Sequence, residues 1–178
     1  MSWYYRVLVI AAAAGFIGTA TWHVLTLLGV EVPRDVWMPL SVGVFIVWFP
    51  AVVATLSVKD RIAADRRNMW KIALEGAPTW LCLAALYIAI YATINFILAT
   101  GGFGSVTDKD PAFPRAGSGI DMIFYVTAMA LLYAAGVREH AVRCPEGHLI
   151  YPGQDFCAVC GQLPAQNQPS AQGGPPAV

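Results

Sequence analysis

The stretch APTWLCLAALYIAIYATINFILA, from Ala77 to Ala99, contains no charged residue and no proline or glycine after Pro78. An α-helix rises about 1.5 Å per residue, so roughly 20 apolar residues cross the hydrocarbon core of a bilayer. Pro78 is tolerated because it falls just inside the start of the helix, where its missing N–H has no partner to lose. The stretch is therefore long enough and apolar enough to be a membrane span.

Three further apolar runs approach or reach this length: Tyr5 to Gly29, Trp37 to Val58 and Gly119 to Val137. The whole chain is 57% hydrophobic and 12% charged, whereas about a quarter of the residues in a soluble domain are charged. The first run could instead be a secretory signal, but its apolar part is long for one. The sequence thus predicts an all-α membrane protein in which residues 1–140 form a four-helix transmembrane bundle, with Pro50 kinking the second span.

Two connections between these spans are longer than the others. Ser57 to Gly76 has no helix breaker before Gly76 and carries five basic residues, which predicts either a basic amphipathic helix on an anionic membrane surface or a solvated helical hairpin. Thr100 to Gly119 is rich in glycine, proline and serine. This second connection is predicted to be an irregular, exposed loop.

The distribution of basic residues predicts the orientation, because loops with an excess of lysine and arginine remain cytoplasmic. Four spans would place eight basic residues on one side of the membrane and three on the other. The eight are Arg6, Lys59, Arg61, Arg66, Arg67, Lys71, Arg138 and Arg143, and the three are Arg34, Lys109 and Arg115. Both termini are therefore predicted to be cytoplasmic.

The C-terminal stretch CPEGHLIYPGQDFCAVCG holds three of the four cysteines and one histidine. Three residues separate Cys144 from His148, two separate Cys157 from Cys160, and eight lie between the pairs. Two tight turns joined by a short loop can aim four ligands at one tetrahedral Zn²⁺ ion, and a cytoplasmic location would keep the thiols reduced. The alternatives for this cluster are unmetallated thiols or a redox-active pair of cysteines. The fourth cysteine, Cys82, stands alone in an apolar run and is predicted to be a core residue.

The segments CPEGH and FCAVCG resemble the zinc-ribbon modules at the ends of many bacterial and archaeal proteins, in which two knuckles clamp one zinc ion. The resemblance covers roughly Arg143 to Leu163 and departs from the all-cysteine form in its single histidine ligand. It implies that Cys144, His148, Cys157 and Cys160 bind Zn²⁺ and, with the small size of the chain, that the membrane is a bacterial inner membrane. Residues 141–163 are thus predicted to be a zinc ribbon, followed by a disordered tail at 164–178.

Polar side chains occur near one end of three predicted spans. His23, Asn95 and Asp121 lie about 9, 6 and 3 Å from the outer boundary, so they could line a shallow pocket open to the outside, with Tyr91 or Tyr125 nearby. The alternative is structural, with a hydrogen bond between His23 and Asn95 while Asp121 caps its helix. His23 is the only histidine in any span, which argues against a haem held by two histidines.

Small residues recur at four-residue spacing within the spans and allow helices to approach closely. Such pairs predict a compact bundle or a homo-oligomer without choosing between them. The pairs are Ala11 with Gly15, Ala14 with Gly18, Ala85 with Ala89 and Ala130 with Ala134.

Two functional hypotheses follow from these features. Four protein ligands leave no open position on the metal, so the zinc is predicted to be structural. The module would act as a cytoplasmic adaptor or regulatory part that docks a protein partner. Its apolar residues Leu149, Ile150, Tyr151 and Phe156 are predicted either to contact that partner or to pack back onto the bundle. Nucleic acid is excluded as a partner because no lysine or arginine follows Arg143. The alternative is a small transporter or channel subunit that uses the polar pocket. An enzyme ranks last because no nucleophile or phosphate-binding motif is present.

Overall fold

The computed structural model describes residues 1–59, 62, 66–100 and 112–164 of the chain. Four long helices dominate it, and each is long and apolar enough to cross a membrane, as the sequence predicts. They are α1 (Trp3–Leu27), α2 (Arg34–Thr55, continued by the 3₁₀ turn η1, Leu56–Val58), α5 (Thr79–Thr100) and α6 (Ala112–Arg138).

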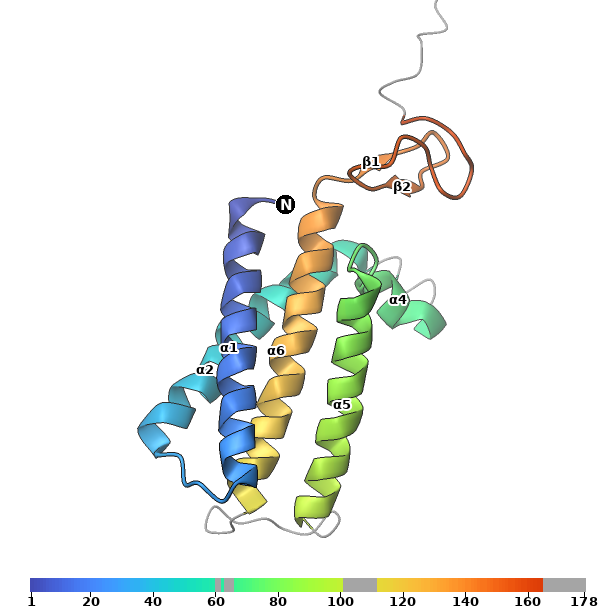
Figure 1. Ribbon diagram of the computed structural model, residues 1–178. Coiled ribbons are helices and arrows are strands. Elements are labelled where there is room, and N and C mark those ends of the chain that lie inside the picture. Colours follow the sequence, from blue (N-terminus) through green and yellow to red (C-terminus); the bar gives the residue numbers. More distant parts are fainter. Residues whose placement is uncertain (60–61, 63–65, 101–111, 165–178) are drawn as a thin grey trace, which may run out of the picture.

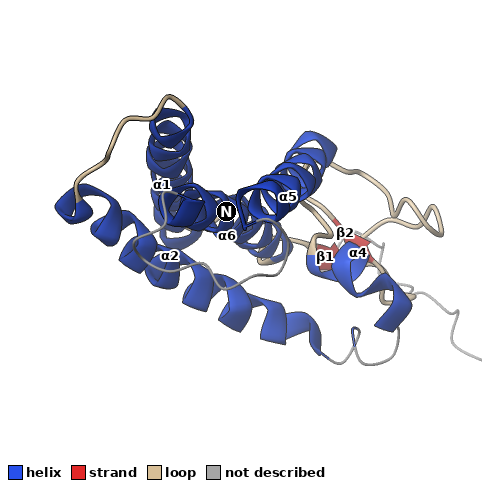
Figure 2. Ribbon diagram, turned by 90° about the horizontal axis from the view of Figure 1, so that it is seen from below, coloured by secondary structure: helices blue, strands red, loops and turns tan. Residues whose placement is uncertain are grey.

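Helix α6 is the centre of the bundle. It packs against α1, α5 and α2, and over half of its apolar stretch is buried, compared with a third or less in the other three helices. Helices α1, α6 and α5 stand side by side, while α2 crosses obliquely behind them (Figures 1 and 2). The outer faces of α1, α2 and α5 expose many large apolar side chains, as expected of helices that face lipid.

Tyr125 of α6 shows how glycine lets these helices approach. A Cβ atom at Gly15 of α1 would overlap the carbon atoms of the Tyr125 ring, and one at Gly43 of α2 would lie 2.5 Å from its hydroxyl oxygen. The ring therefore occupies space that only glycine leaves open on both neighbours. Its hydroxyl donates a hydrogen bond of 2.6 Å to the carbonyl oxygen of Leu40, which joins α6 to α2.

The predicted start of the fourth span was wrong. Helix α6 begins at Ala112, so residues 112–119 are helical and not part of an irregular loop. Pro114 lies in the first helical turn, where its missing N–H costs nothing. Gly117 and Gly119, which resemble loop signals, are packing positions: a Cβ at Gly117 would touch the ring of Trp22, and one at Gly119 would touch Ala92. The rest of the predicted loop, residues 101–111, lies outside the described residues.

The connection between α2 and α5 does not form one amphipathic helix in its described part. It contains η1, a second 3₁₀ turn η2 (Arg66–Asn68) and the short helix α4 (Met69–Ala73), while residues 60–61 and 63–65 lie outside the described residues. Arg138 Nη1 donates hydrogen bonds to the carbonyl oxygens of Ala73 and Glu75, at 2.8 and 3.1 Å. These bonds satisfy carbonyl groups at and just beyond the end of α4 and fix it to α6.

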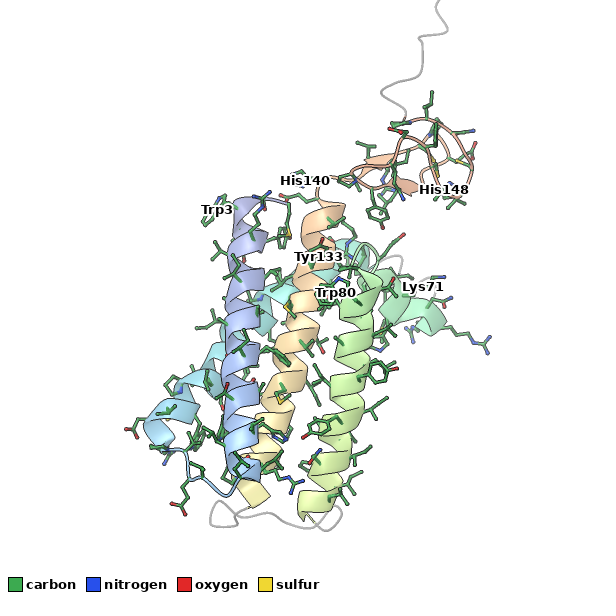
Figure 3. The ribbon with its side chains drawn as sticks, viewed as in Figure 1. Trp3, Lys71, Trp80, Tyr133, His140 and His148 are labelled. Atoms are coloured by element: carbon green, nitrogen blue, oxygen red, sulfur yellow. The ribbon has the colours of Figure 1, made fainter. Side chains whose placement is uncertain are left out.

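A small module follows α6. Strands β1 (Val142–Arg143) and β2 (Leu149–Ile150) pair antiparallel, with Val142 opposite Ile150. The module stands beyond the end of the bundle at which the N-terminus lies, and Figure 3 places His148 within it. The predicted disordered tail covers residues 164–178, of which all but Pro164 lie outside the described residues.

Candidate metal centre

The β1–β2 hairpin builds the first half of the centre. The backbone N–H of Gly147 donates to the carbonyl oxygen of Cys144 at 2.8 Å, and that of Cys144 donates to the carbonyl oxygen of His148 at 3.0 Å. Gly147 has φ of +82°, a conformation that glycine adopts without steric cost. Arg143 Nη1 also donates to the carbonyl oxygen of Gly147 at 2.8 Å. The turn thus brings Cys144 and His148 to the same side of the hairpin.

A second tight turn supplies the other two ligands. The N–H of Gly161 donates to the carbonyl oxygen of Cys157, and the N–H of Cys157 donates to that of Gln162, both at 2.8 Å. Gly161 has φ of +71°, so the residue directly after Cys160 also needs glycine. The glycines that the sequence places in the two knuckles therefore hold the positive φ angles on which both turns depend.

The four candidate ligand atoms lie close together. All of them lie within 4.8 Å of one another, with Cys144 Sγ at 3.6 Å from His148 Nδ1 and at 3.6 Å from Cys160 Sγ. For bonds of about 2.3 Å to sulfur and about 2.0 Å to nitrogen, tetrahedral geometry gives roughly 3.8 Å between two sulfurs and roughly 3.5 Å between sulfur and nitrogen. Cys144, His148, Cys157 and Cys160 are therefore positioned to hold a metal ion.

The centre also forms the core of its module. Cys144 and Cys157 are buried together with Ile150, and Val142 and Cys160 pack against them. A hydrogen bond from the backbone N–H of Cys160 lowers the pKa of the Cys157 thiol to about 7, which favours the thiolate that binds metal. With four protein ligands, the centre can hold an ion but presents no open position for a substrate.

His23 lies in a buried hydrogen-bonded network at the opposite end of the bundle. Its Nδ1 is 2.9 Å from Ser118 Oγ, and its Nε2 is 3.1 Å from the Tyr91 hydroxyl. Because the Ser118 hydroxyl donates to the carbonyl oxygen of Arg115 at 3.1 Å, the pattern assigns Nδ1 as the donor to Ser118 and Nε2 as the acceptor from Tyr91. Three helices, α1, α5 and α6, thus meet at His23.

Asn95 lies beside this network, and Asp121 makes its hydrogen bond to a different helix. Asn95 Oδ1 accepts a hydrogen bond of 2.6 Å from Arg115 Nη2, and Asn95 Nδ2 donates to the carbonyl oxygen of Tyr91 at 3.1 Å. Asp121 instead accepts a bond of 2.6 Å from the hydroxyl of Ser41 on α2. It lies inside α6, not at its start, so the alternative in which Asp121 caps its helix was wrong.

Sequence reasoning missed the partners of these polar residues. Ser118 and Arg115 belong to the stretch that was predicted to be an irregular loop. Without a helix there, nothing in the sequence indicated which way their side chains point. Ser118 is completely buried, and its spacing of three residues from Arg115 permits the side-chain bond to the preceding turn once the segment is helical. Tyr91 was named as a neighbour, and it contacts His23 directly.

The surface of the module differs from the predicted one. Ile150 is only 1% exposed because it fills the module core, and Tyr151 packs against Gly76 at the start of the loop to α5, where an added Cβ would lie 3.3 Å from its ring. The exposed apolar side chains are Phe156 (61%), Val159 (72%) and Leu163 (42%). Four residues of the module were predicted to be exposed. For Ile150 that prediction was wrong, whereas the exposure of Phe156 is confirmed.

Comparison of the chain with protein-family models, curated proteins and solved structures found no match. The geometry of the four ligands and of the helices therefore carries the functional argument.

Proposed function

We propose that the protein is an integral membrane protein that carries a structural zinc ribbon on its cytoplasmic face and docks a protein partner there. The convergence of one imidazole nitrogen and three thiol sulfurs supports zinc, because this donor set in tetrahedral geometry is typical of structural zinc sites. Metal binding would supply folding energy of order 10 kcal/mol to a module whose core is otherwise only a few side chains.

The arrangement of the helix ends supports the proposed orientation. The end that carries the module also carries the N-terminus, η1, α4 and the end of α6 (Figure 1), and with them most of the basic residues. Trp3, Trp80 and Lys71 lie toward this same end (Figure 3), as in an aromatic belt beside a basic cytoplasmic surface. Arg34 begins α2 at the other end. We propose that the basic end lies in the cytoplasm and that the membrane is a bacterial inner membrane.

The docking surface that we propose is the exposed apolar side of the second knuckle. Val159 lies between the two ligating cysteines, Phe156 directly before them and Leu163 just after them, so the metal would hold all three on one rigid turn. Apolar side chains on a fixed scaffold give affinity at low entropic cost. The module has no basic residue beyond Arg143, so the partner would be a protein and not a nucleic acid.

Affinity capture with matched variants tests this proposal. Phe156→Glu and Val159→Glu are expected to retain zinc and lose the captured protein, whereas Cys157→Ser is expected to lose both. Glu146→Ala, an exposed change in the first knuckle, is the control and should retain both. A partner that survives Phe156→Glu and Val159→Glu would refute the proposed surface, and zinc that survives Cys157→Ser would refute the centre.

A small transporter or channel subunit is the second candidate. The observation that favours it is the buried network at His23, because ionisable groups inside a membrane bundle are costly and commonly belong to a pathway. The hydrogen bond of Asp121 to Ser41 on α2 gives no support to a shared three-residue pocket. In reconstituted vesicles, transport predicts that His23→Ala changes solute or proton flux while assembly is retained. Unchanged flux would leave His23 as a structural residue.

A further inference from the structure

Two adjoining hollows separate the end of α2 from α4, and we call them together the α2–α4 slot. The outer hollow has a volume of about 550 Å³ and the inner one about 160 Å³, and they share Thr55, Ile62 and Met69. The outer hollow is also lined by Leu56, Lys59 and Arg66. The inner one is also lined by Trp48, Val52, Trp70, Ala73 and Leu131.

The two ends of the slot have different chemistry. Every residue that lines only the inner hollow is apolar or aromatic, and its floor is formed by Leu131 and Ala73, which are 3% and 4% exposed and belong to the bundle core. Among the residues that the structure describes, the outer hollow is lined by two cations, Lys59 and Arg66, and by no carboxylate. The slot is therefore an apolar channel with a positively charged mouth.

The slot is about as long as an acyl chain that fills one leaflet of a bilayer. Lys59 and Trp48 are eleven positions apart on α2 and its continuation, which corresponds to about 16 Å along the helix. Half of a hydrocarbon core of about 30 Å is roughly 15 Å. Trp70, which is 56% exposed, lies at the rim of the inner hollow, where an indole ring suits the level of the lipid headgroups.

We propose that the α2–α4 slot binds one anionic phospholipid, with its phosphate between Lys59 and Arg66 and one acyl chain along Met69, Val52 and Trp48. Charge complementarity selects an anionic headgroup, and continuity of the inner hollow with the bundle core selects an apolar chain over a polar segment. The stretch from Lys59 to Lys71 carries five basic and two acidic residues, so its net charge also favours an anionic lipid. The inference rests on the membrane location proposed above, but not on the zinc ribbon or its partner.

The test compares two charge variants of the purified protein in detergent micelles. Binding of phosphatidylglycerol, with phosphatidylcholine as the neutral competitor, is followed by native mass spectrometry. Lys59→Gln with Arg66→Gln should weaken phosphatidylglycerol binding by about 25-fold, or roughly fivefold for each cation. Arg67→Gln with Lys71→Gln removes the same charge from the same segment without touching the slot and should change binding by less than about twofold. Equal losses in both pairs would show general surface attraction and overturn the site.

A second pair of variants tests the acyl chain. Val52→Trp fills the inner hollow and should weaken phosphatidylglycerol binding, whereas Val53→Trp, on a neighbouring exposed position outside the slot, should not. Glycerol 3-phosphate serves as the anion without chains. If it competes as well as phosphatidylglycerol, the site binds a free phosphate and the lipid proposal is overturned. Equal binding of phosphatidylcholine and phosphatidylglycerol would overturn the role of the cations.

Partner capture and zinc content are measured on the same variants to keep the two proposals apart. If the unmodified protein shows no preference for phosphatidylglycerol but still captures a protein partner, only the slot is refuted. A lipid preference that depends on Lys59 and Arg66, with no partner captured, would support the slot and refute the adaptor alone.

Discussion

Substitution of Gly43 by alanine tests how α2 meets α6. The new Cβ would lie 2.5 Å from the Tyr125 hydroxyl oxygen, whereas ordinary contacts begin at 3.4 Å. The hydroxyl must therefore retreat by about 0.9 Å from α2. A shift of that size along the bond to the Leu40 carbonyl oxygen lengthens it from 2.6 Å to about 3.5 Å, beyond the range of an O–H···O hydrogen bond.

The expected cost has two parts. Overpacking in a well-packed core costs about 1–3 kcal/mol, and a side-chain hydrogen bond between membrane helices contributes about 1 kcal/mol. Gly43→Ala should therefore lower the free energy of unfolding by about 2–4 kcal/mol, and Tyr125→Phe by about 1 kcal/mol. The double variant should cost only about as much as Tyr125→Phe, because the nearest ring atom, Tyr125 Cζ, lies 3.8 Å from the new methyl group.

Unfolding in mixed micelles with increasing dodecyl sulfate, followed by tryptophan fluorescence, measures these free energies. The control is Gly15→Ala, whose Cβ would overlap ring carbons of Tyr125 that phenylalanine also has. Tyr125→Phe should therefore fail to rescue Gly15→Ala. If the costs of Gly43→Ala and Tyr125→Phe simply add, the hydroxyl does not lie against Gly43 and the described packing of α2 on α6 is refuted.

Three further predictions concern the metal, the polar network and α4. Elemental analysis should find about one zinc ion per chain and only a small fraction of that in Cys157→Ser; an undiminished content would contradict the four-ligand centre. Asn95→Leu removes the acceptor of the bond from Arg115 Nη2 and should lower the free energy of unfolding by about 1–3 kcal/mol. The exposed Thr93→Leu should not, and equal effects would argue against the network. Arg138→Met removes two bonds to carbonyl groups around the end of α4 and should speed amide hydrogen exchange at residues 69–75; unchanged rates would show that α4 is held by packing alone.

The amino-acid sequence by itself determined the existence of four apolar spans and the four candidate metal ligands. A run such as Ala77 to Ala99 is recognisable because length and hydropathy are properties of a local stretch, and helix formation satisfies every backbone group within that stretch. The ligands are recognisable for a similar reason, since Cys144 with His148 and Cys157 with Cys160 each lie on one tight turn. The convergence of the two pairs needed only a short loop between them.

Only the tertiary structure decided what glycine does in α6 and which polar residues meet. Gly117 and Gly119 have the composition of a loop, but they lie inside α6, where an added Cβ would make ordinary contacts with Trp22 and Ala92 of the neighbouring helices. The sequence predicted how deep His23, Asn95 and Asp121 lie along their spans, but not in which direction each side chain points around its helix. Depth follows from counting residues, whereas the partner of a buried polar group depends on how each helix is rotated against its neighbours, and that rotation is set by side-chain packing across the whole bundle.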